Sequence, residues 1–194
     1  MTTAPEIYGL VLVGGRSTRM GRDKAALRYG DKPQAVVAYE LLARCCVKAF
    51  LSCRQGQAVF GLPAIHDTVE NIGPMGGILS ALEMHHGKAW LVLACDLPFL
   101  TAATLRDLIA RRDPSQLATA YRSAHDGKPE PLCAIYEPAI ADRLREFVAR
   151  GEHCPRKALA ALDAFLLDLP EARALDNVNH PHEFDKARSA LAKS

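Results

Sequence analysis

Short apolar runs that alternate with helical patterns are the feature of this chain that most restricts its fold. Residues 8–13 and 88–96 are almost entirely apolar and rich in β-formers, which is typical of strands buried on both faces. Between such runs, apolar residues recur with helical spacing, as in Val37, Leu41 and Cys45. Strands that alternate with helices predict a mostly parallel sheet covered by helices on both faces.

Further elements are predicted along the whole chain. The other strands are expected at residues 47–53, 62–67, 116–122, 130–137 and 164–169. Helices are expected after Asp31, from Ile78, after Thr101, over 140–148, from Pro155 and over 184–191. No linker or change of composition divides the 194 residues, so we expect a single domain over 1–194.

Glycines and polar residues follow four of the predicted strands. Gly14-Gly15 follow the first strand, Ser52 lies near the end of the second, and Asp67 and Asp96 end two others. Because open α/β sheets bind ligands outside the carboxyl ends of their strands, we expect these residues to meet at one edge. Each aspartate alone is explained by a turn cap or by a ligand contact. The shared edge favours the ligand contact, with Asp96 as a Mg²⁺ ligand.

The loop after the first strand concentrates positive charge. Arg16, Arg19, Arg22 and Lys24 closely follow Gly14-Gly15. The loop contains neither G-x-G-x-x-G nor a glycine followed by Lys-Ser or Lys-Thr, so it is neither a dinucleotide fingerprint nor a P-loop. Backbone N–H groups, guanidinium forks and a lysine charge suit a triphosphate. The alternative is a solvated basic turn, but the double glycine at a strand end favours the triphosphate.

Two further segments have a structural and a functional explanation. Residues 72–79 form a glycine-rich turn into a helix, which either binds an anion or a base at the helix N-terminus or needs a positive φ. Asn177 and Asn179 precede Pro181, so they either cap a helix or hold a substrate.

Composition argues against several classes of function. The net charge is +2, from 24 basic and 22 acidic residues, whereas proteins that coat nucleic acid are strongly basic. No apolar run approaches the roughly 20 residues that cross a bilayer, and no signal peptide is recognisable, so we expect a cytoplasmic protein without membrane contact.

The six cysteines include no C-x-x-C pair, and we expect most of them to be buried thiols. We expect the seven histidines on the surface or in packing.

Six motifs occur in order along the chain. They are LVGGRSTRMGRDK (12–24), HD (66–67), GPMGG (73–77), CDLPF (95–99), PEPLCAIY (129–136) and NVNHP (177–181). In this combination the chain resembles the molybdenum cofactor guanylyltransferases of the sugar-nucleotide-transferase-like superfamily. The resemblance implies a Rossmann-like three-layer α/β/α nucleotidyltransferase fold, with a nucleotide-binding half over about 1–115 and an acceptor-binding half over about 116–194.

The resemblance also implies an activity and residue roles. The chain would transfer GMP from GTP to the terminal phosphate of molybdopterin, release pyrophosphate and use Mg²⁺ held by Asp96. Catalytic roles would fall to Lys24, Arg19 and Asp96. Nucleotide contacts would be made by Leu12, Val13, Gly14, Gly15, Lys24, Ser52, Asp67 and Asp96. Acceptor contacts would be made by Asn177, Asn179 and Arg156. Transient contact with other molybdenum cofactor biosynthesis proteins or acceptor apoenzymes is implied as well.

Three positions differ from the pattern usual in the family. Val13 stands where alanine is usual, Ser52 where asparagine is usual, and Glu130 where histidine or glutamine is expected. The alternatives are a cytidylyltransferase for the same cofactor, a sugar- or polyol-phosphate nucleotidyltransferase, and a nucleotide-binding sensor without turnover. Gly14-Gly15 and GPMGG favour guanine over cytosine, and Lys24 together with Asp96 argues against a sensor.

Overall fold

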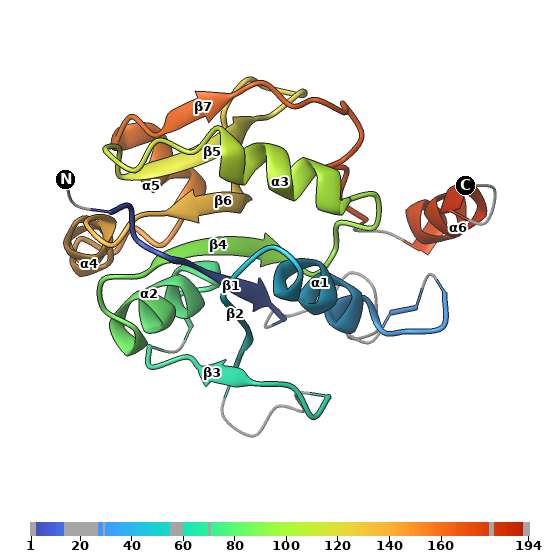
Figure 1. Ribbon diagram of the computed structural model, residues 1–194, viewed down its shortest axis with the longest axis horizontal. Coiled ribbons are helices and arrows are strands. Elements are labelled where there is room, and N and C mark those ends of the chain that lie inside the picture. Colours follow the sequence, from blue (N-terminus) through green and yellow to red (C-terminus); the bar gives the residue numbers. More distant parts are fainter. Residues whose placement is uncertain are drawn as a thin grey trace.

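The computed structural model describes residues 3–13, 27–28, 30–54, 60–69, 71–178 and 181–191 (Figure 1). Its elements follow in the order β1 (Ile7–Leu12), α1 (Gln34–Ala43), β2 (Lys48–Cys53), β3 (Ala64–His66), α2 (Pro74–Met84), β4 (Ala89–Ala94), α3 (Ala102–Ala110), β5 (Ala118–Arg122), β6 (Pro129–Tyr136), α4 (Ile140–Ala149), α5 (Pro155–Ala161), β7 (Phe165–Leu167) and α6 (Pro181–Leu191). Each strand predicted from the sequence is present, with ends that differ by a few residues.

The described strands form one sheet in the order β3-β2-β1-β4-β6-β5-β7. Neighbouring strands are parallel except where β6 pairs with β4 and with β5. The link from β5 to β6 is short, and within it the Ser123 N–H donates to the Lys128 carbonyl at 2.8 Å. A connection of this length joins antiparallel strands, because a parallel pair needs a longer crossover. The prediction of a mostly parallel sheet is confirmed.

Helices cover both faces of the sheet and form two separate cores (Figure 1). Helices α1 and α3 pack on one face, and helices α2, α4 and α5 pack on the other. Strand β4 contributes to both cores, since Trp90 and Val92 point to the α2 side and Leu91 and Leu93 to the α1 side. This alternation explains why β4 is apolar along its whole length.

Two helix starts test the local predictions. Thr101 caps α3 as predicted, with its hydroxyl accepting a hydrogen bond from the Thr104 N–H at 3.3 Å. The predicted start of α2 at Ile78 is wrong, because the helix begins at Pro74. Gly73 precedes it with a φ of 62°, and the fixed φ of proline suits the first helical position.

The six cysteines are all free thiols, and they differ in exposure. Cys53, Cys95 and Cys133 are buried as predicted, and Cys45 and Cys46 are half-buried. Cys154 is exposed just before α5, so three of the six cysteines are buried. Among the helices in the described residues, none combines the length and the apolar character that a membrane crossing requires.

Candidate active site

The carboxyl ends of β1, β2, β3 and β4 lie at one edge of the sheet, as predicted. In the parallel pairings Leu12 lies opposite both Ser52 and Ala94, and Cys53 lies opposite His66. The residues that follow these strands, including Asp67 and Asp96, therefore lie at the same edge. Gly14, Gly15, Arg19 and Lys24 lie outside the described residues, so their predicted roles stay predictions.

Ser52 and Asp67 are joined directly at this edge. The Ser52 hydroxyl donates to Asp67 Oδ1 at 2.7 Å, and the Asp67 N–H donates to the Cys53 carbonyl at 3.0 Å. Burial raises the pKa of the Asp67 carboxyl, while the hydrogen bond from Ser52 and the charges of Arg54 and His66 lower it. Ser52 and Asp67, which are both predicted to contact the nucleotide, are thus linked by a hydrogen bond.

The glycines of GPMGG allow α2 to pack closely against the strand ends. A Cβ on Gly77 would lie 2.1 Å from Ser52 Oγ and 2.8 Å from Leu12 Cδ2. A Cβ on Gly76 would lie 2.7 Å from the Val69 carbonyl oxygen. The predicted positive φ occurs at Gly73, and the binding of an anion or a base at the N-terminus of α2 stays a prediction. Gly76 and Gly77 lie inside the helix. Glycine is needed at both positions because a side chain there would clash with atoms of the neighbouring segments.

Asp96 follows β4 and lies next to the segment that contains Asn177. The Val178 N–H donates to the Asp96 carbonyl at 3.2 Å, which holds this distant segment at the end of β4. Asp96 and Asn177 line one cavity of about 370 Å³, together with Arg156 from the start of α5. Asn179 lies outside the described residues. Three of the residues predicted for metal and acceptor binding therefore share a cavity.

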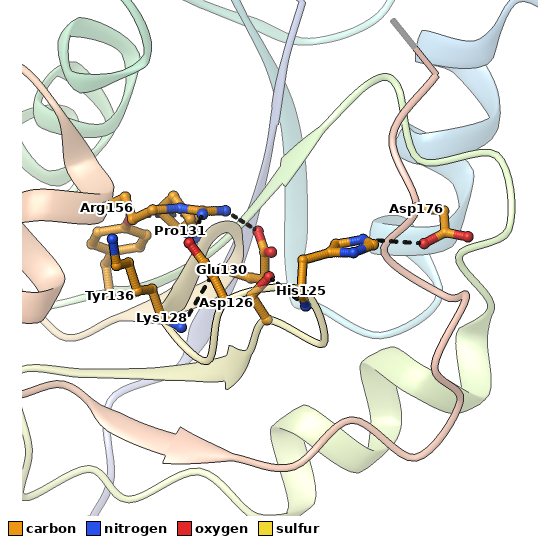
Figure 2. A network of polar contacts seen from close by, with 9 residues as sticks. His125, Asp126, Lys128, Glu130, Pro131, Tyr136, Arg156 and Asp176 are labelled. Carbon is orange, nitrogen blue, oxygen red and sulfur yellow. Dashed lines mark hydrogen bonds and ion pairs between the residues drawn. The ribbon is translucent and has the colours of Figure 1, made fainter. Parts of the chain in front are cut away.

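A second cavity of about 570 Å³ shares Glu130, Arg156, Leu175 and Asn177 with the first, so the two adjoin. Figure 2 shows the polar network around Arg156. Arg156 Nη2 lies 2.9 Å from Glu130 Oε2, and Nη1 lies 3.3 Å from Asp126 Oδ2. Among the residues that line the second cavity, His125 Nε2 lies 3.8 Å from Asp176 Oδ1. Arg156 is thus placed beside the predicted acceptor site, but two carboxylates already compensate its charge.

The fold and the order of motifs match a known protein family. Residues 9–165 match the family model of the MobA-like NTP transferase domain, which is most of the chain. The chain belongs to this family.

Named relatives agree with the MobA-like assignment. The chain is 39% identical over 182 residues to the molybdenum cofactor biosynthesis bifunctional protein of Synechocystis, spanning 92% of this chain but only 52% of that protein. It is 31% identical to a probable molybdenum cofactor guanylyltransferase of Mycobacterium tuberculosis, over 89% of each chain. The chain therefore spans about half the length of the Synechocystis relative and most of the mycobacterial one.

A solved structure shares the MobA-like fold. Molybdopterin-guanine dinucleotide biosynthesis protein A from Archaeoglobus fulgidus superposes with a TM-score of 0.81, covering 96% of this chain and 100% of that chain. The sequence identity is 22%, so this likeness shows the fold alone. It agrees with the predicted three-layer nucleotidyltransferase architecture.

The surroundings of two predicted nucleotide contacts and of three histidines bear on the candidate site. Leu12 and Val13 have buried side chains in opposite cores, so any contact they make with a nucleotide would be through the backbone. His125 and His153 are exposed, as expected, and they also line the two cavities. His85 does pack as expected, with its ring 5.3 Å from that of Tyr8. No local pattern distinguishes His125 and His153 from His85, because the cavities form between distant segments.

Proposed function

We propose that this MobA-like domain transfers GMP from GTP to the terminal phosphate of molybdopterin. An oxygen of the acceptor phosphate attacks the α-phosphorus of GTP, and the bond from that phosphorus to the bridging oxygen breaks. Pyrophosphate leaves with the electron pair of that bond. The names of the relatives support the substrates, and the shared family supports the type of reaction.

One observation carries the proposal. Asp96 belongs both to the strand edge that holds Ser52 and Asp67 and to the cavity that contains Asn177 and Arg156. A nucleotide at the edge and an acceptor in the cavity would meet at Asp96. Transfer between two anions depends on such positioning more than on a protein nucleophile.

Asp96 would hold the magnesium ion. Mg²⁺ bound with nucleotides takes one or two carboxylates together with phosphate oxygens, and a half-buried carboxylate that borders the cavity fits this donor set. When bound, the ion would supply positive charge at the phosphates. Lys24 and Arg19 would offset the repulsion between the two reactants and stabilise charge that develops on the leaving pyrophosphate.

Nucleotide selectivity is the first test of the proposal. We expect calorimetric titration with GTP, CTP, ATP and UTP, each with Mg²⁺, to show a preference for GTP, followed by pyrophosphate release from GTP when molybdopterin is added. A preference for CTP would transfer the chain to the cytidylyl branch. Binding of GTP without pyrophosphate release from any acceptor would support a sensor, and no binding at all would remove the nucleotide proposal.

The charge network predicts how the acceptor binds. A phosphate that reaches Arg156 would compete with Glu130 and Asp126 for its guanidinium. We expect Arg156→Ala to raise the KM for molybdopterin by about tenfold, the value of one charge-assisted hydrogen bond, and to leave GTP affinity unchanged. Glu130→Gln should lower this KM, because it removes a competing carboxylate. Steady-state kinetics at saturating GTP measure both effects.

A matched arginine controls for general loss of charge. Arg143 lies exposed on α4, paired with Glu146 at 3.4 Å, and Arg143→Ala should leave both constants unchanged. An Arg156→Ala variant with a normal KM for the acceptor would show that Arg156 serves only the fold.

A further inference from the structure

We infer that Ser52 is a positioning residue that acts through Asp67: it orients the carboxylate toward the nucleotide and does not contact the nucleotide itself. The inference rests on the proposed function only for the identity of the ligand. It differs from the role that the family resemblance implies for this position, which is direct contact.

The Ser52 hydroxyl is enclosed. The residue is 2% exposed, its hydroxyl donates to Asp67 Oδ1 at 2.7 Å, and Gly77 of α2 approaches so closely that a Cβ there would lie 2.1 Å from Oγ. A base or sugar therefore cannot approach this hydroxyl unless α2 moves away from the sheet.

The backbone around Asp67 is restrained from both sides. The Asp67 N–H donates to the Cys53 carbonyl of β2 at 3.0 Å. The next N–H, that of Thr68, donates to Ser80 Oγ at 2.8 Å, and the Ser80 hydroxyl donates to the Gly76 carbonyl at 2.8 Å. With the main chain held, the hydrogen bond from Ser52 to Oδ1 sets the rotation of the carboxylate and thereby the direction of Oδ2.

The same hydrogen bond favours the charged form of Asp67. Burial raises the pKa of this carboxyl, and the hydrogen bond from Ser52 is the largest of the effects that lower it. The other ionisable groups that act on Asp67 are Arg54 and His66. Asp67 in turn raises the pKa of the Cys53 thiol, although burial of that thiol is the larger cause. Ser52 thus favours the ionised form of a half-buried carboxylate, the form that accepts hydrogen bonds from a ligand.

The test is a double-mutant cycle on GTP affinity, measured by calorimetry with Mg²⁺. We expect Ser52→Ala to weaken GTP binding by about tenfold, as for loss of one hydrogen bond to a charged group. In an Asp67→Ala background the same Ser52→Ala change should have no further effect, because Ser52 acts only through Asp67. Independent losses that multiply would show direct contact between Ser52 and the nucleotide and would overturn the inference.

A titration of the ligand-free protein separates this inference from the proposed function. Carbon-detected NMR of the Asp67 carboxyl should give a higher pKa in Ser52→Ala than in the wild type, with Ser52→Cys in between because a thiol is a weaker donor. In the variant, GTP affinity should accordingly begin to fall at a higher pH as the solution is acidified. An unchanged pKa would overturn the inference even if GTP binds, and a raised pKa would support the positioning of Asp67 even if GTP does not bind.

Tyr121→Phe is the matched control. The Tyr121 hydroxyl is also buried, and it also donates to a carboxylate oxygen, Asp107 Oδ2, at 2.9 Å. Tyr121 lies on β5 and Asp107 on α3. Removal of the Tyr121 hydroxyl should reduce stability without changing GTP affinity or the pKa of Asp67. A loss of GTP affinity in Tyr121→Phe as large as in Ser52→Ala would show that general destabilisation explains both.

Discussion

Asp96→Asn is expected to reduce the rate of GMP transfer by about a thousandfold, the size of effect that follows the loss of a metal-ligand or transition-state charge contact. Asparagine keeps the shape of the side chain and removes its charge. The backbone bond from the Val178 N–H to the Asp96 carbonyl should persist, so the cavity should remain intact. The measurement is pyrophosphate release at saturating GTP and molybdopterin over a range of Mg²⁺ concentrations.

The Asp96 variant should also respond differently to Mg²⁺. Wild-type affinity for GTP should increase when Mg²⁺ is added, whereas the affinity of Asp96→Asn should increase much less. Asp142 is a suitable control, since its side chain is 87% exposed on α4, and Asp142→Asn should retain full activity. A turnover of Asp96→Asn close to that of the wild type would remove Asp96 from the proposed metal site.

Lys24→Ala is expected to reduce turnover by about a hundredfold to a thousandfold, as for the loss of one preorganised charge at a phosphoryl group. Because Lys24 is proposed to neutralise the phosphates, the loss of affinity should be large for GTP and small for guanosine. Calorimetry with both ligands, together with the pyrophosphate assay, measures this difference.

Lys32 provides the matched control for Lys24. Its ammonium lies 2.6 Å from Glu40 on the surface, and Lys32→Ala should leave GTP affinity and turnover unchanged. Equal losses for GTP and guanosine in Lys24→Ala would place the lysine away from the phosphates and contradict its proposed role.

Local patterns were sufficient for the strands, for most helices and for the edge of the sheet where the candidate site lies. Strand β4 is apolar at every position because helices cover it on both sides, and Thr101 caps α3 through an N–H only three residues further along. Since the carboxyl ends of neighbouring parallel strands meet, the positions of Ser52, Asp67 and Asp96 in sequence were enough to place them together.

The glycines of GPMGG show where local reasoning was insufficient. A glycine-rich turn has several explanations from its own sequence, and the close packing at Gly77 of α2 depends on Ser52 and Leu12, which belong to two strands of the sheet. Arg156 is similar, because the family resemblance implied only that it contacts the acceptor. Only the packing of α5 against β6 shows that Glu130 and Asp126 already lie beside it.

The amino-acid sequence was enough to predict the strands, most helices, the layer architecture, the family and the residue types at the strand ends. These depend on periodicity, capping and motif order, which are properties of neighbours along the chain. The folded structure was needed to show that Ser52 donates a hydrogen bond to Asp67, that Arg156 is paired with carboxylates, and that the segment before α6 reaches Asp96. Such contacts join residues that are distant along the chain, and their geometry depends on how helices and strands pack together.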